Sequence, residues 1–184
     1  MNFELTAKAR EAENSKLRIQ NSKFLSVALY EPEIPPNAGN IARLCAATGT
    51  PLHLIGRLGF SFRHPDARRA GMDYWDQVEL YRHINFGDFV GSVDPGRVWA
   101  MTTHGKMSLW EASFEPGDTL LFGPESRGLP TDILEASPTR CLRIPMRSEA
   151  RSLNLATAVG IALYEGLRQL QSDSRLVDTA DPAV

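Results

Sequence analysis

The chain has 184 residues, 42% of them hydrophobic and 23% charged, which is the composition of an ordinary globular domain. Its formal net charge is −2, so any nucleic-acid partner would need a local basic surface. Cys45 and Cys141 stand in no CxxC or His/Cys cluster, which argues against a metal site and a disulfide framework. We find neither an apolar signal core nor a run of membrane-spanning length, and therefore expect a cytoplasmic protein with no membrane partner.

Strand-like apolar runs alternate with helical patterns from residue 25 onward. Residues 1–24 form a polar N-terminal extension and residues 172–184 a polar tail, which leaves 25–171 as one domain. Runs bounded by Gly, Pro or Asp predict strands at 25–32, 51–56, 97–103, 119–123 and 141–146. Apolar periodicity predicts helices at 37–49, 65–75, 85–91, 130–136 and 152–171. This alternation is typical of an α/β fold whose mostly parallel sheet is covered by helices on both faces.

The predicted helix at 37–49 has one apolar side and one flat polar side. Its apolar positions follow helical spacing and predict a core face: Ile41, Leu44, Cys45 and Thr48. Asn40, Arg43 and Ala47 share the opposite side. Taken alone, the helix is more simply interpreted as a surface helix with an Asn cap and a solvated Arg, so the rest of the chain must decide whether its polar side has a function.

Three predicted strands end in loops rich in Gly, Pro and Ser. The loops are TTHGK (102–106), FGPESRGLP (122–130) and IPMRSEARSLNLA (144–156). Ligands of open parallel sheets bind beyond the carboxyl ends of the strands. The chain has no GxxxxGK[ST] and no GxGxxG after its first strand, which disfavours a dinucleotide or nucleoside-triphosphate enzyme. The loops indicate a shared pocket of backbone groups and apolar walls, although each alone could be a tight turn.

A basic and aromatic cluster spans residues 57–75. It combines Arg57, Arg63, His64, Arg68 and Arg69 with Phe60, Phe62, Tyr74 and Trp75. Guanidinium groups beside aromatic rings suit phosphate contacts and base stacking. A solvated basic face over core aromatics is the alternative, because three aspartates in and next to the cluster offset part of its charge.

The predicted C-terminal helix is apolar on one side and mixed on the other. Its main stripe comprises Leu155, Val159, Ala162, Leu163, Leu167 and Leu170. On the other side, Ile161 and Tyr164 lie near Arg168, a composition typical of a protein interface. Burial against another element of the same chain would explain it equally well.

Four segments together resemble the SPOUT class of S-adenosylmethionine-dependent RNA methyltransferases. They are LYEPEIPPNAGNIARLCAATG (29–49), RRAGMDYW (68–75), LLFGPESRGLP (120–130) and RIPMRSEARSLNLATAVGIALYE (143–165). The likeness extends to the small tRNA 2′-O-methyltransferases that modify the wobble cytidine or uridine ribose of leucine tRNAs. The extension at 1–24 departs from the family pattern, because small members begin near the first strand.

The resemblance implies a C-terminal deep trefoil knot, which ordinary topology rules would exclude. It also implies a homodimer, S-adenosylmethionine as co-substrate, no metal, and the anticodon stem-loop of tRNA as partner. By position, the donor-binding residues would be Met101, Gly123, Ile144, Ser152, Leu153 and Asn154.

The RNA side of the implied site involves a second group of residues. Asn37, Asn40 and Arg43 match the motif that meets the RNA. Asn40, Arg43 and Tyr164 would act on the substrate, with Arg43 orienting the ribose hydroxyl because a guanidinium stays protonated and is a poor base. We expect Arg68 and Arg69 to contact phosphates.

Two rival functions remain open. One is methylation of another tRNA site or of ribosomal RNA, and the short chain without an obvious RNA-binding appendage favours the wobble position instead. The other is a non-catalytic RNA-binding module on the same fold, against which the presence of Asn40, Arg43 and all three loops argues.

Overall fold

The structure is a computed structural model that describes residues 25–60, 75 and 77–170. The described residues form one seven-stranded sheet in the order β3-β2-β1-β6-β4-β7-β5. The neighbouring strands pair in parallel. The strands are β1 (Ser26–Tyr30), β2 (Leu52–Ile55), β3 (Leu80–His83), β4 (Val98–Met101), β5 (Met107–Ser108), β6 (Thr119–Phe122) and β7 (Cys141–Arg143). The prediction of a parallel sheet is confirmed.

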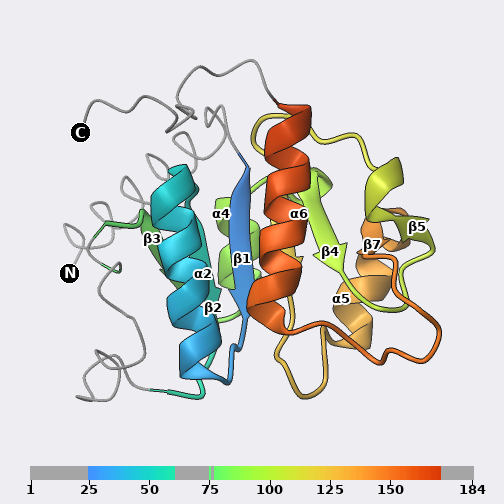
Figure 1. The fold of residues 1–184 in the computed structure, drawn as a ribbon. Helices are drawn as coiled ribbons and strands as arrows, with labels where there is room; N and C mark the ends of the chain where they lie inside the picture. Colours follow the sequence, from blue (N-terminus) through green and yellow to red (C-terminus); the bar gives the residue numbers. More distant parts are fainter. Residues whose placement is uncertain (1–24, 61–74, 76, 171–184) are drawn as a thin grey trace, which may run out of the picture.

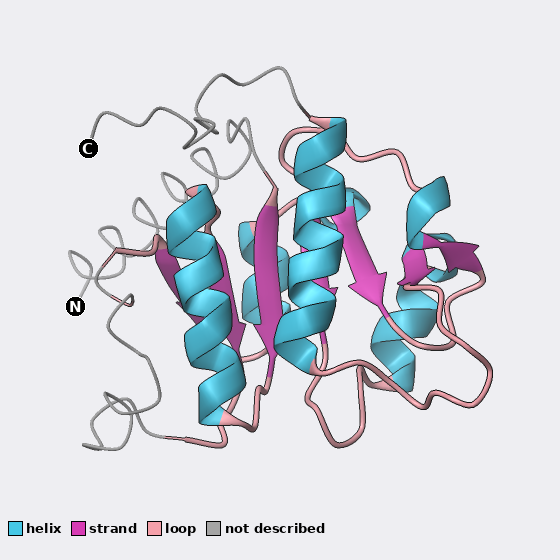
Figure 2. Ribbon diagram, viewed as in Figure 1, coloured by secondary structure: helices cyan, strands magenta, loops and turns pink. Residues whose placement is uncertain are grey.

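Helices cover both faces of this sheet (Figures 1 and 2). On one face lie α2 (Pro35–Thr48) and α6 (Leu155–Gln169), which pack against the larger core cluster. On the other face lie α4 (Phe86–Ser92) and α5 (Thr131–Ala136), whose buried Phe89 and Ile133 belong to the smaller cluster. Short 3-10 turns occur at Pro95–Arg97, Leu109–Glu111 and Pro138–Arg140. The layered arrangement therefore agrees with the expectation from sequence.

The strands that sequence patterns missed lie at the two edges of the sheet. The strand β3 contains Arg82 and half-buried positions, and β5 has only two residues, so neither produces a continuous apolar run. The helix expected at 65–75 lies outside the described residues except for Trp75. The helix expected at 37–49 begins earlier, at Pro35, because proline suits the first helical turn.

The two sides of α2 are distributed as its periodicity predicts. Ile41, Cys45 and Thr48 are buried, whereas Asn40 and Arg43 are exposed. The helix ends before Gly49, which has the left-handed backbone conformation (φ +65°) that favours glycine at this position. The predicted core side and polar side of α2 are both confirmed.

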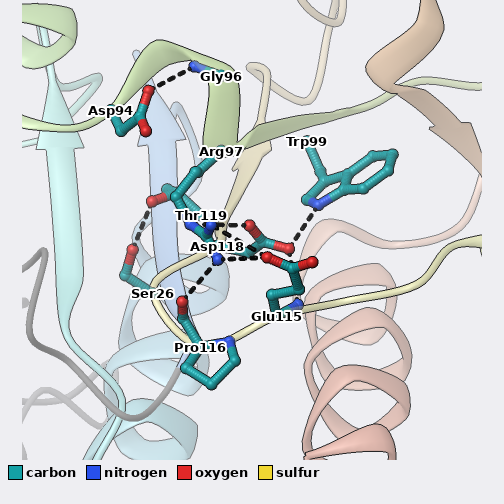
Figure 3. A network of polar contacts seen from close by, with 9 residues as sticks. All are labelled: Ser26, Asp94, Gly96, Arg97, Trp99, Glu115, Pro116, Asp118 and Thr119. Carbon is teal, nitrogen blue, oxygen red and sulfur yellow. Dashed lines mark hydrogen bonds and ion pairs between the residues drawn. The ribbon is translucent and has the colours of Figure 1, made fainter.

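At the amino-terminal ends of the strands, a buried carboxylate ties several segments together (Figure 3). Asp118 is 2% exposed, and its Oδ2 accepts a hydrogen bond from Trp99 Nε1 at 2.9 Å. Arg97 Nε lies 3.4 Å from Asp118 Oδ1. The adjacent hydroxyls of Ser26 and Thr119 lie 2.7 Å apart. The contacts of Trp99 and Arg97 compensate the burial of the charge, and the contact of Ser26 with Thr119 connects the first residues of β1 and β6.

Candidate active site at the carboxyl ends of the strands

The three loops singled out in the sequence follow strands that lie side by side. In the sheet register Met101 is opposite Phe122 on one side and Leu142 on the other. The carboxyl ends of β4, β6 and β7 therefore lie at one edge, at the bottom of Figure 1. Thr102 N donates to Leu142 O at 2.9 Å, which joins the loop after β4 to strand β7. The three loops therefore start at the same edge of the sheet, whereas a pocket shared by them stays a prediction.

Two glycines allow these loops to pack backbone against backbone. A Cβ atom at Gly105 would lie 2.6 Å from the carbonyl carbon of Leu142, and one at Gly123 would lie 2.3 Å from Leu129 N. Neither position has room for a side chain, because real Cβ contacts essentially never fall below 3.0 Å. The β4–β5 loop thus presses on β7, and the loop after β6 folds back onto its own end.

An array of ion pairs joins the loop after β1 to the loop after β6. Glu33 accepts hydrogen bonds from Ser126 N at 2.9 Å and from Ser126 Oγ at 2.7 Å. Arg127 contacts Glu33 at 3.0 Å and also pairs with Glu31. The hydrogen bonds from Ser126, followed by the charge of Arg127, lower the pKa of Glu33 below its usual value. Glu33 is therefore ionised at neutral pH and holds the two loops together.

Asn37, which was expected at the RNA, is buried at 6% exposure. Its Nδ2 donates to Glu125 Oε1 at 3.0 Å, and its Oδ1 accepts from Asn154 Nδ2 at 2.9 Å. Helical geometry explains this placement, because residues 37, 41 and 45 share one side of α2. The structure therefore directs Asn37 into the protein, whereas Asn40 and Arg43 lie on the exposed side.

The expected donor-binding residues cluster at this edge. Met101 ends β4, while the half-buried Gly123 and Ile144 directly follow β6 and β7. Ser152 is exposed and Leu153 half-buried just before α6. The N-cap of α6 is Asn154, whose Oδ1 accepts from Ala156 N and Thr157 N.

The expected residues on the outer side of α6 have different surroundings. Tyr164 is 55% exposed, whereas Ile161 is half-buried against the larger core cluster. Packing within the same chain thus explains part of the Ile161 surface. Tyr164 follows Asn154 by ten residues, about 15 Å along a helix axis, so it lies away from the strand-end loops of its own chain.

Most of the basic and aromatic cluster lies outside the described residues. Arg68 and Arg69 lie outside the described residues, as do Arg63 and His64. Trp75 is half-buried and packs against the larger core cluster, as the core alternative predicted for the aromatic members. The contact of Arg68 and Arg69 with phosphates stays a prediction.

Sequence reasoning missed the residues that connect the loops. The sequence places Glu125 and Arg127 only in a Gly- and Pro-rich loop, and Glu31 and Glu33 only at and just beyond the end of a predicted strand. The sequence signal for their pairing is the two negative charges of EPE (31–33) and the positive charge of Arg127. That signal is weak, because more than 90 residues separate the ion-paired groups.

Known proteins similar to this chain are RNA methyltransferases. The chain is 52% identical over 148 residues to a tRNA (cytidine(34)-2′-O)-methyltransferase of Aeromonas hydrophila, covering 80% of this chain and 95% of the relative. The enzyme of the same name from Escherichia coli K12 is 48% identical, with 80% and 94% covered.

Solved structures agree with these relatives. One, described as giving structural insights into the 2-OH methylation of C/U34 on tRNA, has 53% identity, a TM-score of 0.76, and coverage of 82% of this chain and 99% of its own. A SpoU methyltransferase from Streptomyces viridochromogenes in complex with AdoMet has 27% identity and a TM-score of 0.72, with 83% and 63% covered.

Two further observations concern the described residues. No helix among them is long and apolar enough to cross a membrane. No group of three or more His, Cys, Asp or Glu side chains that could hold a metal ion was found in this part of the chain. The model of the SpoU rRNA methylase family matches residues 25–164, so the chain belongs to that family.

Proposed function

We propose that the chain is an S-adenosylmethionine-dependent 2′-O-methyltransferase that acts on the wobble cytidine or uridine ribose of leucine tRNAs. The observation that carries this proposal is the 52% identity to a tRNA (cytidine(34)-2′-O)-methyltransferase across 95% of that relative. The expected cytoplasmic location follows only from this choice of substrate.

The residues at the strand ends fit the methyl donor chemically. S-adenosylmethionine is a nucleoside with a cationic sulfonium and no phosphates, and when bound it supplies the methyl group. Met101, Ile144 and Leu153 offer apolar atoms at this edge, and the ends of parallel strands offer backbone donors and acceptors. Such a set suits an uncharged adenosine moiety without a phosphate cradle.

Arg43 and Asn40 are proposed to act on the ribose. Both lie on the exposed side of α2, and α2 begins at the edge where the loops meet. A guanidinium stays protonated and is therefore suited to orient the 2′-hydroxyl and stabilise negative charge developing on its oxygen. Alignment of a weak oxygen nucleophile accounts for much of the rate in such reactions.

We further propose that two copies of the chain form a homodimer. Exposed Tyr164 and half-buried Ile161 lie on the same side of α6, and apolar residues grouped on a surface favour a partner. A dimer would also allow Tyr164 of one copy to act at the site of the other. A substitution of Ile161 would also disturb the core, so Tyr164→Glu tests the dimer more directly. Sedimentation of the wild type as an active monomer would refute the dimer.

The C-terminal trefoil knot is part of the same proposal. Two features support it: β7 lies between the consecutive strands β4 and β5, and the loop at Gly105 presses directly on the Leu142 backbone. A knot in which the C-terminal segment passes through the β4–β5 loop requires both of these features. An experimental structure in which 144–170 does not pass through the 102–106 connection would remove the knot.

The decisive experiment measures methyl transfer from labelled S-adenosylmethionine to leucine tRNA transcripts. We expect incorporation at the ribose of the wobble nucleotide, mapped by mass spectrometry of nuclease fragments, and none in a transcript carrying a 2′-deoxy wobble residue. Methylation of another tRNA position or of ribosomal RNA would establish the rival enzyme function. RNA binding without transfer or donor binding would establish the non-catalytic module.

A further inference from the structure

Glu125 binds the backbone just before a helix to which it does not belong. Ile34, the N-cap of α2, makes no side-chain capping hydrogen bond, and the next two residues, Pro35 and Pro36, have no N–H to donate. Glu125, in the loop after β6, accepts from the two residues that precede the helix, at 2.9 Å from Glu33 N and 3.2 Å from Ile34 N. A carboxylate at a helix N-terminus also interacts favourably with the helix dipole. The start of α2 is thus held by a residue 91 positions away.

The third hydrogen bond of Glu125 begins a directional series of side chains. An ionised carboxylate only accepts hydrogen bonds, so Asn37 must turn its Nδ2 toward Glu125 and its Oδ1 toward Asn154. Asn154 must then donate through Nδ2, which leaves its Oδ1 for Ala156 N and Thr157 N at the start of α6. The charge of Glu125 therefore determines the orientation of both amides.

This series connects three segments of the proposed site, namely the start of α2, the loop after β6 and the start of α6. Asn37 lies one turn before Asn40, Glu125 follows Gly123 in the loop after β6, and Asn154 directly follows Leu153. Figure 1 shows the first turns of α2 and α6 at the same edge of the sheet. A rotation of either amide would break a bond at the first turn of one of these helices.

We infer that Glu125 is a positioning residue, which acts through Asn37 and Asn154 to hold the starts of α2 and α6 in the geometry that methyl transfer requires. The catalytic part of this inference rests on the proposed function. Glu125 itself need not touch either substrate. Its effect on the rate comes from the placement of Arg43 and of the residues before α6.

Exchange of the two interacting groups tests the inference. Glu125→Gln places an amide where Asn37 donates, and Asn37→Asp places two carboxylates face to face. Each substitution should lower the single-turnover rate by roughly 100-fold, the loss expected from misplacement by about 1 Å. In the double variant, the introduced glutamine amide can donate to the new carboxylate, which still accepts from Asn154. The double variant should therefore recover about tenfold relative to the product of the single effects.

Nuclear magnetic resonance tests the hydrogen-bond series from Glu125 to Asn154 independently of enzymatic activity. The side-chain amide protons of Asn154 should shift and exchange faster with solvent in Glu125→Gln, although Glu125 does not contact Asn154. Glu135→Ala is the matched control, because Glu135 is an exposed glutamate on the neighbouring α5. It should change neither the Asn154 signals nor the rate.

The outcomes separate this inference from the proposed function. Unchanged Asn154 signals in Glu125→Gln, or single effects that simply multiply in the double variant, would overturn the positioning role. Unfolding midpoints of all variants are measured in parallel. They show whether a lower methyl-transfer rate comes from global destabilisation of the variant. If wild type methylates no tRNA, the proposed function fails, whereas the Asn154 signals still decide whether the directional series exists.

Discussion

Substitution of Gly123 by alanine tests the close packing of the loop after β6. The new Cβ would lie 2.3 Å from Leu129 N and 2.4 Å from the carbonyl carbon of Gly128. Reaching the 3.0 Å limit of real Cβ contacts requires a backbone displacement of at least 3.0 − 2.3 = 0.7 Å. Both neighbours are backbone atoms that no side-chain rotation can move aside.

The expected cost is that of overpacking, about 1–3 kcal/mol in the free energy of unfolding. Displacement of 128–129 should also weaken binding of S-adenosylmethionine, although the introduced methyl group meets the chain itself and not the ligand. Urea unfolding and calorimetric titration of the donor measure the two effects separately. Gly91→Ala on α4 is the control, because a Cβ there meets nothing within 4 Å, and alanine should stabilise that helix by roughly 0.5–1 kcal/mol. Wild-type stability of Gly123→Ala would refute the close approach.

Three further predictions concern the reaction, the opposite end of the sheet and pH. Arg43→Ala should abolish single-turnover methyl transfer at unchanged donor affinity and unfolding midpoint, because Arg43 lies on the exposed side of α2; wild-type turnover would exclude Arg43 from the reaction. Asp118→Asn should lower the unfolding free energy by about 2–3 kcal/mol, because the buried carboxylate accepts from Trp99 and pairs with Arg97; unchanged urea unfolding would contradict this. Burial lowers the pKa of His53 to about 3 from 6.5, so the unfolded chain binds the proton first and stability falls as pH drops below 6.5. The loss due to His53 should be about 2 kcal/mol at pH 5. His53→Leu should reduce the total loss without removing it, because burial also lowers the pKa of the neighbouring His83, and the loss should persist in His104→Ala, since His104 is exposed.

The sequence predicted the parts of the fold that have local signals. Periodicity identified the buried side of α2, because the pattern repeats over a few residues. Continuous apolar runs identified five of the seven strands, namely β1, β2, β4, β6 and β7. The two edge strands have no such pattern: β3 carries Arg82, and β5 contains only Met107 and Ser108.

The site was predicted less completely, for a physical reason. Recognition of the motifs brought the three loops together, but it assigned residues one by one and could not say which side chains bond to each other. Asn37 illustrates the limit, because its helical spacing to Ile41 and Cys45 already favoured the buried side, while its motif suggested RNA. Its partners Glu125 and Asn154 are 88 and 117 positions away, and no local pattern contains such a pair.

Each end of the sheet has a carboxylate that is at least partly removed from water, and the two carboxylates have different partners. At the amino-terminal end, Asp118 is buried and bonded to an indole and a guanidinium, which fixes strand starts far from the proposed reaction. At the carboxyl end, Glu125 is only half-buried and bonds to backbone N–H groups and an amide, so its neutralisation removes an acceptor without leaving an unpaired guanidinium. Loss of charge at Asp118 should therefore act mainly on stability, whereas loss of charge at Glu125 should act mainly on the rate. If Asp118→Asn and Glu125→Gln both changed only the free energy of unfolding, Glu125 would have no positioning role at the carboxyl ends of the strands.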